Sequence, residues 1–523
     1  MRDQHKSWVL LTGVTGFLGP ALAHELLGRG HRVACLVRAT TPADARRRVV
    51  RALRSWTEDV EHLLETGRLI ALRGDVHKAG AGLDARVRAS LCGRVRALVH
   101  AAGNTDFRGT SDGEPHRTNV DGTRSVLDLA CALRCRNWHF VSTAYVAGVA
   151  DVAYEAVSAA PPEFHNAYEH SKWQAEHIAR TLAGKAGAVL TIHRPSIVVG
   201  HSETGRVTRC KGIYHLFRAT ALLARVAEQT DASNRKVIPL RIHARPEGCP
   251  NLICIDDVAF AFGELFDHPA ACGGVYHLTH PAPPSNAQIK RVLEQCYELA
   301  GGTFVDGDPS GAEAKPEDSG AARFQALFDQ ATGPIRAYLF DAPRFDRREI
   351  ERFVGRPPAA WSDTRLRRLV HAAQAAGWHP PEDERYTTVA PQEIARYFQD
   401  YLPRKLGRHA GERVGHLDLS VRFAIGPAAQ GRWWCRFADG RVALVEPDTG
   451  QPADVVYRTS ASRFWAAVSG QVSGAELFLS GEARIEGDIE RALKFAMVLE
   501  EFVRNHPYQP ATITSNPTNV CEP

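Results

Sequence analysis

Short apolar runs alternate with amphipathic stretches through the first 200 residues. The apolar runs lie at residues 8–12, 32–37, 68–72, 96–100, 138–142 and 189–193, and another follows at 274–278. Apolar positions spaced as on a helix face lie between them, at 20–27, 121–133 and 168–182. Strands that alternate with helices indicate βαβ units and a parallel sheet covered on both faces. The predicted fold class is therefore α/β, a doubly wound sheet of the Rossmann type.

The pattern loosens after residue 200. Helical periodicity returns at 213–227, 350–376 and 391–406, whereas residues 301–320 are rich in Gly, Asp, Glu, Ala and Pro. A segment of that composition is typical of a mobile insertion. We therefore predict a Rossmann domain with substrate segments over 1–280 and a mostly helical substrate or cap region over 281–410.

A different pattern begins near residue 411. Residues 417–425 alternate, and the runs 432–437 and 441–445 flank Asp439-Gly440, a strong hairpin signal. Helical stretches follow at 462–468, 475–479 and 490–504. These features predict a compact α+β domain over 411–508, followed by a flexible tail over 509–523.

Composition narrows the class of protein. The chain has 523 residues, 44 % apolar and 24 % charged, and a net charge of +5, which is typical of a globular protein and excludes a disordered or collagen-like chain. Its basic residues are scattered among acids, so we expect no nucleic-acid partner. Eleven cysteines without CxxC spacing indicate free thiols and a cytoplasmic location. No apolar run reaches the ~20 residues of a membrane helix, and no metal-binding histidine spacing occurs.

The chain's first strand ends in a glycine motif. Gly13, Gly16 and Gly19 lie between that strand and a predicted helix. There, glycines allow a tight turn, the approach of a pyrophosphate and close helix–strand packing, and the helix N-terminus favours negative charge. The motif predicts a dinucleotide site, with a purely structural turn as the alternative.

Two further positions bear on the cofactor. Arg38 ends the second strand, where an acidic residue is usual for NADH and an arginine accommodates the 2′-phosphate of NADPH. NADPH is therefore favoured over NADH, the alternative being that Arg38 is a solvated surface charge. Asp75 and Val76 follow the third strand, where a carboxylate can meet the adenine, or where Asp75 only supports a turn.

Tyr168 and Lys172 are four residues apart and share one face of a predicted helix. An ammonium beside a phenol stabilises the phenolate, so such a tyrosine can give a proton to a carbonyl oxygen as hydride arrives. Ser142 and Thr143 follow an apolar strand and place a hydroxyl at the same edge of the sheet. We predict a catalytic site, with a surface Tyr/Lys pair as the alternative.

Residues 8–200 resemble the extended short-chain dehydrogenase/reductase superfamily, and within it the acyl-thioester reductases. That branch comprises fatty acyl-CoA reductases and the terminal reductase domains of carboxylic acid reductases and nonribosomal peptide synthetases. The segments that carry the resemblance are TGVTGFLG at 12–19, LVRA at 36–39, GDV at 74–76, HAAGNTDF at 100–107, TNVDGT at 118–123, VSTAYVAG at 141–148, YEHSK at 168–172 and RPSIVVG at 194–200.

The resemblance implies roles for individual residues. It makes Thr143, rather than Ser142, the hydroxyl partner of Tyr168 and Lys172. The cofactor-binding residues that it implies, together with those above, are Gly13, Thr15, Gly16, Phe17, Leu18, Gly19, Arg38, Asp75, Val76, His100, Ala102, Gly103, Tyr168, Lys172, Pro195, Ser196 and Ile197. Asn119 would be structural. The chain lacks the adenylation and carrier domains of carboxylic acid reductases, so its thioester, on CoA or an acyl carrier protein, would come from another molecule.

Residues 411–507 resemble the sterol carrier protein fold, a small lipid-binding domain, through ADVVYRTSASRFWAAVSGQ at 453–471 and LFLSGEARIEGDIERALKFAMVLEEF at 477–502. The resemblance implies an apolar tunnel. Apolar surface would come from Trp434, Phe464, Trp465, Phe478, Leu479, Phe495, Leu499 and Phe502. A packing or dimerisation module is the alternative, because any domain of this size needs such a core.

These observations predict an NADPH-dependent reductase that converts a lipid-like acyl thioester to an aldehyde. A second hydride transfer would give the alcohol, and the sequence leaves open whether it occurs. One alternative is an NAD(P)-dependent dehydrogenase or epimerase that acts on a sterol or sugar-nucleotide hydroxyl. Another is a lipid carrier whose Rossmann domain binds nucleotide without turnover. The intact Tyr168/Lys172 pair argues against the carrier, because an inactive site need not keep both residues.

Overall fold

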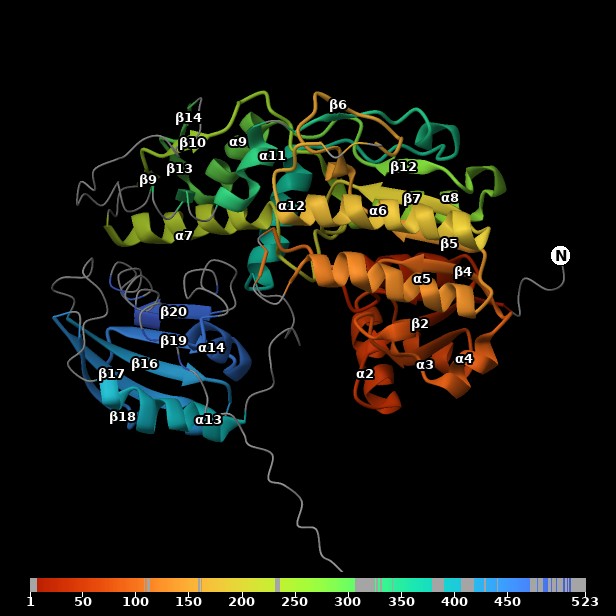
Figure 1. Cartoon of the computed structure of the whole chain (residues 1–523). Helices are drawn as coiled ribbons and strands as arrows, with labels where there is room; N and C mark the ends of the chain where they lie inside the picture. Colours follow the sequence, from red (N-terminus) through yellow and green to blue (C-terminus); the bar gives the residue numbers. More distant parts are fainter. Residues whose placement is uncertain are drawn as a thin grey trace, which may run out of the picture. The chain divides into compact units, whose positions relative to one another are not determined.

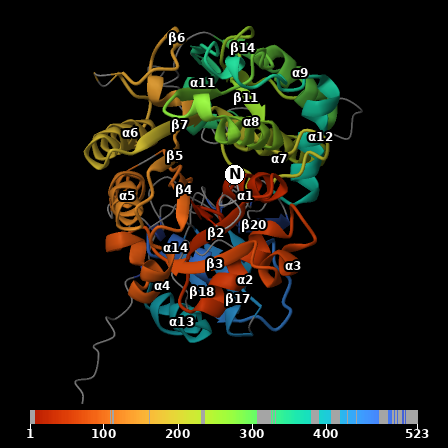
Figure 2. The same ribbon diagram turned by 90° about the vertical axis from the view of Figure 1, so that its right-hand side faces the viewer.

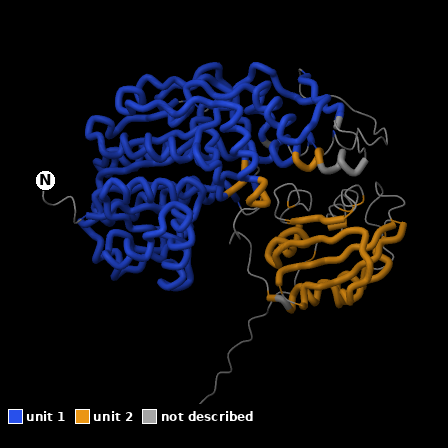
Figure 3. The backbone as a smooth tube through the Cα atoms, turned by 180° about the vertical axis from the view of Figure 1, so that it is seen from behind, with its two compact units in different colours: residues 1–208, 212–220, 233–373 blue, residues 209–211, 221–232, 374–523 orange. Residues whose placement is uncertain are grey.

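A computed structural model of the chain describes residues 7–508 except 108, 111–112, 159, 161, 231–235, 306–324, 326–327, 330–331, 341, 379–389, 406–417, 428, 440, 471–476, 478–482, 488–490, 492–494, 496–501, 504–505 and 507. The chain forms two compact units (Figure 3). The first comprises residues 1–208, 212–220 and 233–373, and the second comprises 209–211, 221–232 and 374–523. Most of the predicted insertion 301–320 and all of the predicted tail 509–523 lie outside the described residues.

A parallel sheet of seven strands is the centre of the first unit (Figure 1). Its order is β12-β7-β5-β4-β1-β2-β3, and each neighbouring pair is parallel. The strands are β1 (Trp8–Thr12), β2 (Arg32–Arg38), β3 (Leu69–Gly74), β4 (Val95–His100), β5 (Asn137–Val141), β7 (Val189–Pro195) and β12 (Val275–Leu278). The predicted doubly wound α/β fold is confirmed.

Helices cover both faces of this sheet, as Figure 2 shows. Residues of β1 alternate between the two layers: Val9 and Leu11 pack with residues of α1 (Gly19–Gly28) and α8 (Ile255–Asp267). Trp8 and Leu10 pack with residues of α5 (Gly122–Ala132) and α6 (Ala167–Ala186). Both faces of the strand are thus buried, which explains its continuous apolar run. Along the chain, α2 (Pro42–Leu53) and α3 (Val60–Glu65) lie between β2 and β3, and α4 (Ala85–Leu91) lies between β3 and β4.

The strand order reverses beside β1, which pairs with β2 on one side and β4 on the other. Thr12, the last residue of β1, pairs with Leu36 in β2 and with His100 in β4. The carboxyl ends of open α/β sheets bind ligands at such a switch point. The topology therefore places the predicted nucleotide site at the end of β1.

Short strand pairs and further helices lie outside the main sheet. They are β6 (Val152–Ala153) with β15 (Arg344–Phe345), β8 (Ile197–Val199) with β11 (Leu252–Cys254), β9 (Lys236–Val237) with β13 (Leu299–Ala300), β10 (Arg241–His243) with β14 (Thr303–Val305), and the helices α7 (Tyr214–Thr230), α9 (Asn286–Tyr297), α11 (Arg336–Phe340) and α12 (Asp363–Ala375). The single helix predicted over 350–376 is wrong, since a 3₁₀ turn at Ile350–Arg352 is separate from α12. Pro357 and Pro358 lie between them, and proline prevents a continuous helix.

The second unit contains a mixed sheet of five strands in the order β18-β17-β16-β19-β20. The central strand β16 is antiparallel to β17 and parallel to β19. The strands are β16 (Leu419–Ile425), β17 (Arg432–Ala438), β18 (Arg441–Pro447), β19 (Val455–Thr459) and β20 (Ala483–Gly487), and the helices of this unit are α13 (Pro391–Arg396) and α14 (Ala461–Val468). The predicted hairpin is confirmed by the antiparallel pairing of β17 with β18.

The core of the second unit includes residues that precede the predicted start at 411. A π-helical turn over Tyr397–Tyr401 continues α13. Phe398 in this turn is 1 % exposed and stacks on Trp433 and Phe464, with ring centroids 5.3 and 5.5 Å away. The segment 391–402 thus packs with the C-terminal sheet rather than with the preceding helical region.

The adjacent tryptophans of β17 lie on opposite sides of the sheet. Trp433 is buried in the core, whereas Trp434 is partly exposed and its indole donates to the carbonyl oxygen of Pro452 at 3.0 Å. The prediction that Trp434 contributes apolar core surface is therefore wrong. Phe464, Trp465, Phe495 and Phe502 are buried as predicted, and the side chains of Phe478, Leu479 and Leu499 lie outside the described residues.

Candidate active site

The glycine turn after β1 packs too closely for side chains. Gly13 has a φ of +82°, and a Cβ built there would lie 2.6 Å from the backbone of Ala101. A Cβ on Gly19 would lie 2.0 Å from the carbonyl oxygen of Gly13, to which Gly16 donates its N–H at 2.8 Å. No side chain caps the start of α1. The turn therefore presents the N-terminus of a ten-residue helix, the arrangement that suits a pyrophosphate.

Three arginines surround the end of β2. Arg38 is exposed, and the guanidinium of Arg48 donates to its carbonyl oxygen. Arg73 donates from Nη1 to the carbonyl oxygen of Thr40 at 3.1 Å. The Thr41 hydroxyl caps α2, because its oxygen accepts the N–H of Asp44 at 3.1 Å. Positive charge thus gathers where a ribose lies in a Rossmann fold.

The turn after β3 is fixed by Asp75. Its N–H donates to the carbonyl oxygen of Ala81 at 2.7 Å, and its Oδ1 accepts the N–H of His77 at 3.1 Å. Asp75 is partly exposed, and Val76 lies against Gly122 at the start of α5. The carboxylate therefore supports the turn and remains in reach of solvent.

His100 and Asn119 organise the end of β4. Burial lowers the pKa of His100 to about 3, so the ring is neutral. Its Nδ1 lies 2.7 Å from the hydroxyl of Thr12, which also accepts the N–H of Ala102 at 3.2 Å. Asn119 exchanges two 2.8 Å hydrogen bonds with the backbone of Asn104. Asn119 thus has the expected structural contacts.

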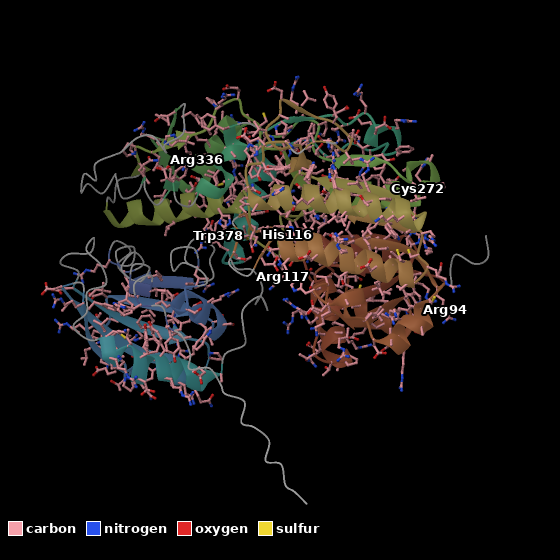
Figure 4. The ribbon with its side chains drawn as sticks, viewed as in Figure 1. Arg94, His116, Arg117, Cys272, Arg336 and Trp378 are labelled. Carbon is pink, nitrogen blue, oxygen red and sulfur yellow. The ribbon has the colours of Figure 1, made fainter. Side chains whose placement is uncertain are left out.

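The loop after β4 is held by Glu114. Its carboxylate accepts hydrogen bonds from Thr118, at 2.8 Å, and from the amide of Asn104, at 3.3 Å. Arg117, which begins the π-helical turn leading into α5, lies 3.3 Å from the same carboxylate (Figure 4). These contacts fix the segment that contains Gly103, where a Cβ would lie 3.9 Å from the Lys172 ammonium.

Thr143, Tyr168 and Lys172 converge at the carboxyl end of β5. Asn166 begins α6 by accepting the N–H of Glu169 at 3.0 Å, which places Tyr168 in the first turn and Lys172 one turn later. Thr143 follows β5 and hydrogen-bonds with the Tyr168 phenol. The Lys172 ammonium donates to the carbonyl oxygen of Val141 at 2.7 Å. The predicted catalytic residues therefore lie together.

Burial sets the protonation of this cluster. It raises the pKa of Tyr168 to about 12, against the opposing effect of the Thr143 hydrogen bond. It lowers the pKa of Lys172 to about 8, while the Glu176 carboxylate acts in the opposite direction. At pH 7 the phenol is thus a proton donor and most of the ammonium is charged. Glu176 itself is buried in a bidentate ion pair with Arg194, at 2.7 and 2.9 Å.

The segment after β7 closes the same edge of the sheet. The carbonyl oxygen of Pro195 lies 3.5 Å from the Thr143 hydroxyl. The Ser196 hydroxyl lies 2.7 Å from the Asn251 side chain, and Ile197 donates its N–H to the backbone oxygen of Asn251 at 3.0 Å. Pro195 and Thr143 therefore meet, while Ser196 is anchored to Asn251, 55 residues further along, and Ile197 is anchored to the same residue.

A tyrosine from a distant segment also reaches the site and was not predicted. The Tyr338 hydroxyl, on α11, donates to the buried Glu169 carboxylate at 2.6 Å and accepts from the Asn166 amide at 2.7 Å. Its ring lies 5.7 Å from that of Phe107, which is 6.3 Å from the Tyr168 ring. Sequence spacing gives no signal for this contact, because 169 residues separate its partners.

No group of three or more metal-ligating side chains occurs among the described residues. Within the same part of the chain, none of the helices has the length and apolarity that crossing a bilayer requires. The ten cysteines that the structure describes are free thiols.

Two protein families match this chain, one over the Rossmann-type sheet and one over the C-terminal unit. Residues 11–245 match the NAD-binding family described as male sterility protein, and residues 398–500 match the SCP-2 sterol transfer family. These matches confirm both resemblances seen in the sequence.

Similar proteins include a lipopeptide synthase and an aldehyde reductase. The chain is 33 % identical over 215 residues to an isonitrile lipopeptide synthase of Streptomyces coeruleorubidus. That match covers 40 % of this chain and 14 % of the synthase. It is 30 % identical over 321 residues to the aldehyde reductase lnaA of Aspergillus flavus. That match covers 58 % of this chain and 28 % of lnaA. The chain thus spans less than a third of either relative.

The fold is similar to that of the terminal R domain from the myxalamid PKS-NRPS biosynthetic pathway. The two share 23 % identity at a TM-score of 0.57, over 71 % of this chain and 91 % of that domain. This likeness supports the architecture of the fold.

Proposed function

We propose that the protein is an NADPH-dependent reductase of a lipid-like acyl thioester, carried on CoA or on an acyl carrier protein. The observation that carries the proposal is the convergence of Thr143, Tyr168 and Lys172 beside the glycine turn. The match to the male sterility family and the similarity to a lipopeptide synthase and an aldehyde reductase favour a thioester over a sugar or sterol hydroxyl. The product is an aldehyde, and a second reduction would give the alcohol.

The chain's own residues supply the proton chemistry. The bound nicotinamide supplies the hydride to the thioester carbonyl carbon. Tyr168 and Thr143 donate hydrogen bonds to the carbonyl oxygen as negative charge develops there, and the Tyr168 proton moves to that oxygen. Lys172 stabilises the phenolate that forms. Collapse of the resulting hemithioacetal breaks the C–S bond, and the hydroxyl proton leaves with the thiol.

NADPH, rather than NADH, is supported by the charge at the end of β2. Arg38 ends β2, Arg48 donates to the Arg38 carbonyl oxygen, and Arg73 donates to the carbonyl oxygen of Thr40, whose own N–H donates to the Asp44 carboxylate at 3.3 Å. No acidic side chain ends β2 to bind the ribose hydroxyls, since Arg38 takes that place. A guanidinium cluster suits a phosphate because its N–H groups match the phosphate oxygens.

The C-terminal domain is proposed to bind lipid. Its support is the match of residues 398–500 to the sterol transfer family. For the domain limits we propose the predicted division at 280, and we move the predicted boundary at 410 to about 390 because Phe398 packs in the core of the C-terminal unit. The lipid would be a substrate or product of the reductase.

A coupled measurement tests the proposed function. NADPH oxidation is followed by absorbance with acetyl-CoA and octanoyl-CoA, NADP+ reduction is followed with a sterol, and conversion of a UDP-sugar is followed by chromatography. NADH and NAD+ replace NADPH and NADP+ in parallel. Consumption with acyl-CoA, together with aldehyde trapped as a hydrazone, supports the proposal. Turnover of the sterol or the UDP-sugar alone would favour the alternative dehydrogenase or epimerase. Turnover of none of them, nor of an octanoyl thioester on an acyl carrier protein, with NADPH binding intact, would favour a carrier.

A further inference from the structure

An apolar pocket of about 60 Å³ lies in the first unit, away from the glycine turn. Its wall comes from α7, β10, α9, β13, β14 and α11. Its apolar lining includes Leu216, Ala244, Ile289, Leu293 and Leu339. All five are buried.

The polar side chains of this wall have partners within the protein. The Thr220 hydroxyl donates to the carbonyl oxygen of Leu216 at 2.9 Å. The Asn286 amide donates to the carbonyl oxygens of Leu339, at 2.6 Å, and Arg245, at 2.8 Å. Lys290 and Glu294 pair with each other at 2.7 Å. The pocket therefore offers surface to an apolar ligand, because its polar groups are already engaged.

The helix α11 links this pocket to the candidate active site. Leu339 lines the pocket. The preceding residue, Tyr338, donates to Glu169, the neighbour of Tyr168, and its ring lies 5.7 Å from that of Phe107. Consecutive residues of one helical turn thus line the pocket and contact the catalytic helix.

We propose that the pocket binds the methyl end of the substrate's acyl chain. This inference rests on the proposed function and specifies the substrate as a thioester with an aliphatic chain long enough to reach beyond α11. The volume of about 60 Å³ is several times the ~10–15 Å³ that one water-sized group requires, so it admits the last few carbons of a chain. An apolar side chain of a partner protein is the competing occupant.

Two opposite substitutions test the pocket. Ala244→Leu adds three carbons to the wall and should fill it, whereas Leu293→Ala removes three and should enlarge it. Each full-length variant is assayed with acetyl-CoA and with CoA esters of increasing chain length. The ratio of kcat/KM between long and short chains corrects for any general loss of folded enzyme.

The expected result is opposite for the two variants. Ala244→Leu should lower the ratio of octanoyl-CoA to acetyl-CoA turnover by about 10-fold or more, the discrimination that one methylene gives in a tight pocket. Leu293→Ala should move the preferred chain to a greater length. An unchanged chain-length profile in both variants would overturn the inference and favour a partner's side chain. If Ala244→Leu does not fold, the milder Ala244→Val replaces it.

A binding experiment separates this inference from the proposed function. The binding of 1-octanol to the full-length protein is measured by calorimetry, with Ala244→Leu for comparison. Loss of one binding site in the variant supports the pocket even where the wild type reduces no acyl thioester. Equal binding by both proteins rejects the pocket whether or not the thioester is reduced.

Discussion

Replacing Tyr338 with phenylalanine isolates the contact between α11 and the catalytic helix. The substitution removes one hydroxyl and leaves the ring contact with Phe107, at 5.7 Å. The lost hydroxyl donates to Glu169 at 2.6 Å and accepts from Asn166, the residue that caps α6. Burial and the neighbouring Glu169 carboxylate both raise the pKa of Tyr338, so the hydroxyl is the donor.

The size of the effect follows from the charge and burial of the acceptor. A hydrogen bond to a charged group contributes about 1.5–3 kcal/mol, and Glu169 is fully buried. Contacts to Glu169 from the backbone and ring of His165, at 3.0 and 3.2 Å, remain in the variant. We therefore expect unfolding to become easier by about 1.5–3 kcal/mol. If the same ~1.5–3 kcal/mol were lost from the transition state because Tyr168 is displaced, kcat would fall by about 10- to 150-fold, which is the upper limit of the effect.

Two assays and a matched control check this prediction. Denaturant unfolding gives the change in free energy, and NADPH-dependent turnover of octanoyl-CoA gives kcat separately from the KM for NADPH. The control is Tyr276→Phe, in β12. The Tyr276 hydroxyl donates to a neutral acceptor, the carbonyl oxygen of Ala271, at 2.8 Å. The control substitution should lower the free energy of unfolding by about 1 kcal/mol and leave kcat unchanged. Equal effects of the two substitutions on both quantities would refute a special role for Tyr338.

Four more outcomes can be measured. Tyr168→Phe should lower kcat by about 10²–10⁴-fold with NADPH binding intact, and normal turnover would exclude Tyr168 as the acid. Arg38→Glu should raise the KM for NADPH by about tenfold or more and change that for NADH less, so equal effects would remove Arg38 from the 2′-phosphate site. Because burial lowers the pKa of Lys172 to about 8, its charge is lost above that pH, and kcat should decline as pH rises through about 8; a flat profile to pH 10 would contradict this assignment. Phe398→Ala should destabilise the second unit by about 3–5 kcal/mol in calorimetry, and an unchanged melting profile would show that Phe398 does not support its core.

The alternating pattern of the first 200 residues was sufficient to predict the central sheet. Its strands are buried on both faces, so each appears as an apolar run, and glycines mark the turn after β1. Tyr168 and Lys172 could be placed together because their spacing of four residues puts them on one helix face. A hydroxyl could be placed beside them because Ser142 and Thr143 follow a strand of the same sheet, and the family resemblance assigned that role to Thr143. Whether these residues act as predicted is a matter for the assays above.

Other features depend on contacts that no local pattern contains. Tyr338 meets Glu169 across 169 residues, and Phe398 joins a core whose other members lie in later strands. The side of the sheet taken by Trp434 is different, because the sequence did contain the answer. Cys435 and Phe437 are buried, and period-two alternation then places Trp433 with them and Trp434 on the other face.

The contact between Tyr338 and the catalytic helix also has a consequence for the order of events during synthesis. The six strands from β1 to β7 along the main sheet are complete once Pro195 has been made, and domains fold from the N-terminus as the chain emerges. At roughly 5–20 residues per second, the ~140 residues up to Tyr338 take on the order of 10–30 s more. During that interval the nascent chain has most of its nucleotide-binding sheet, while Glu169 still lacks its partner from α11. Cofactor binding can therefore precede the completed substrate site in the life of each molecule.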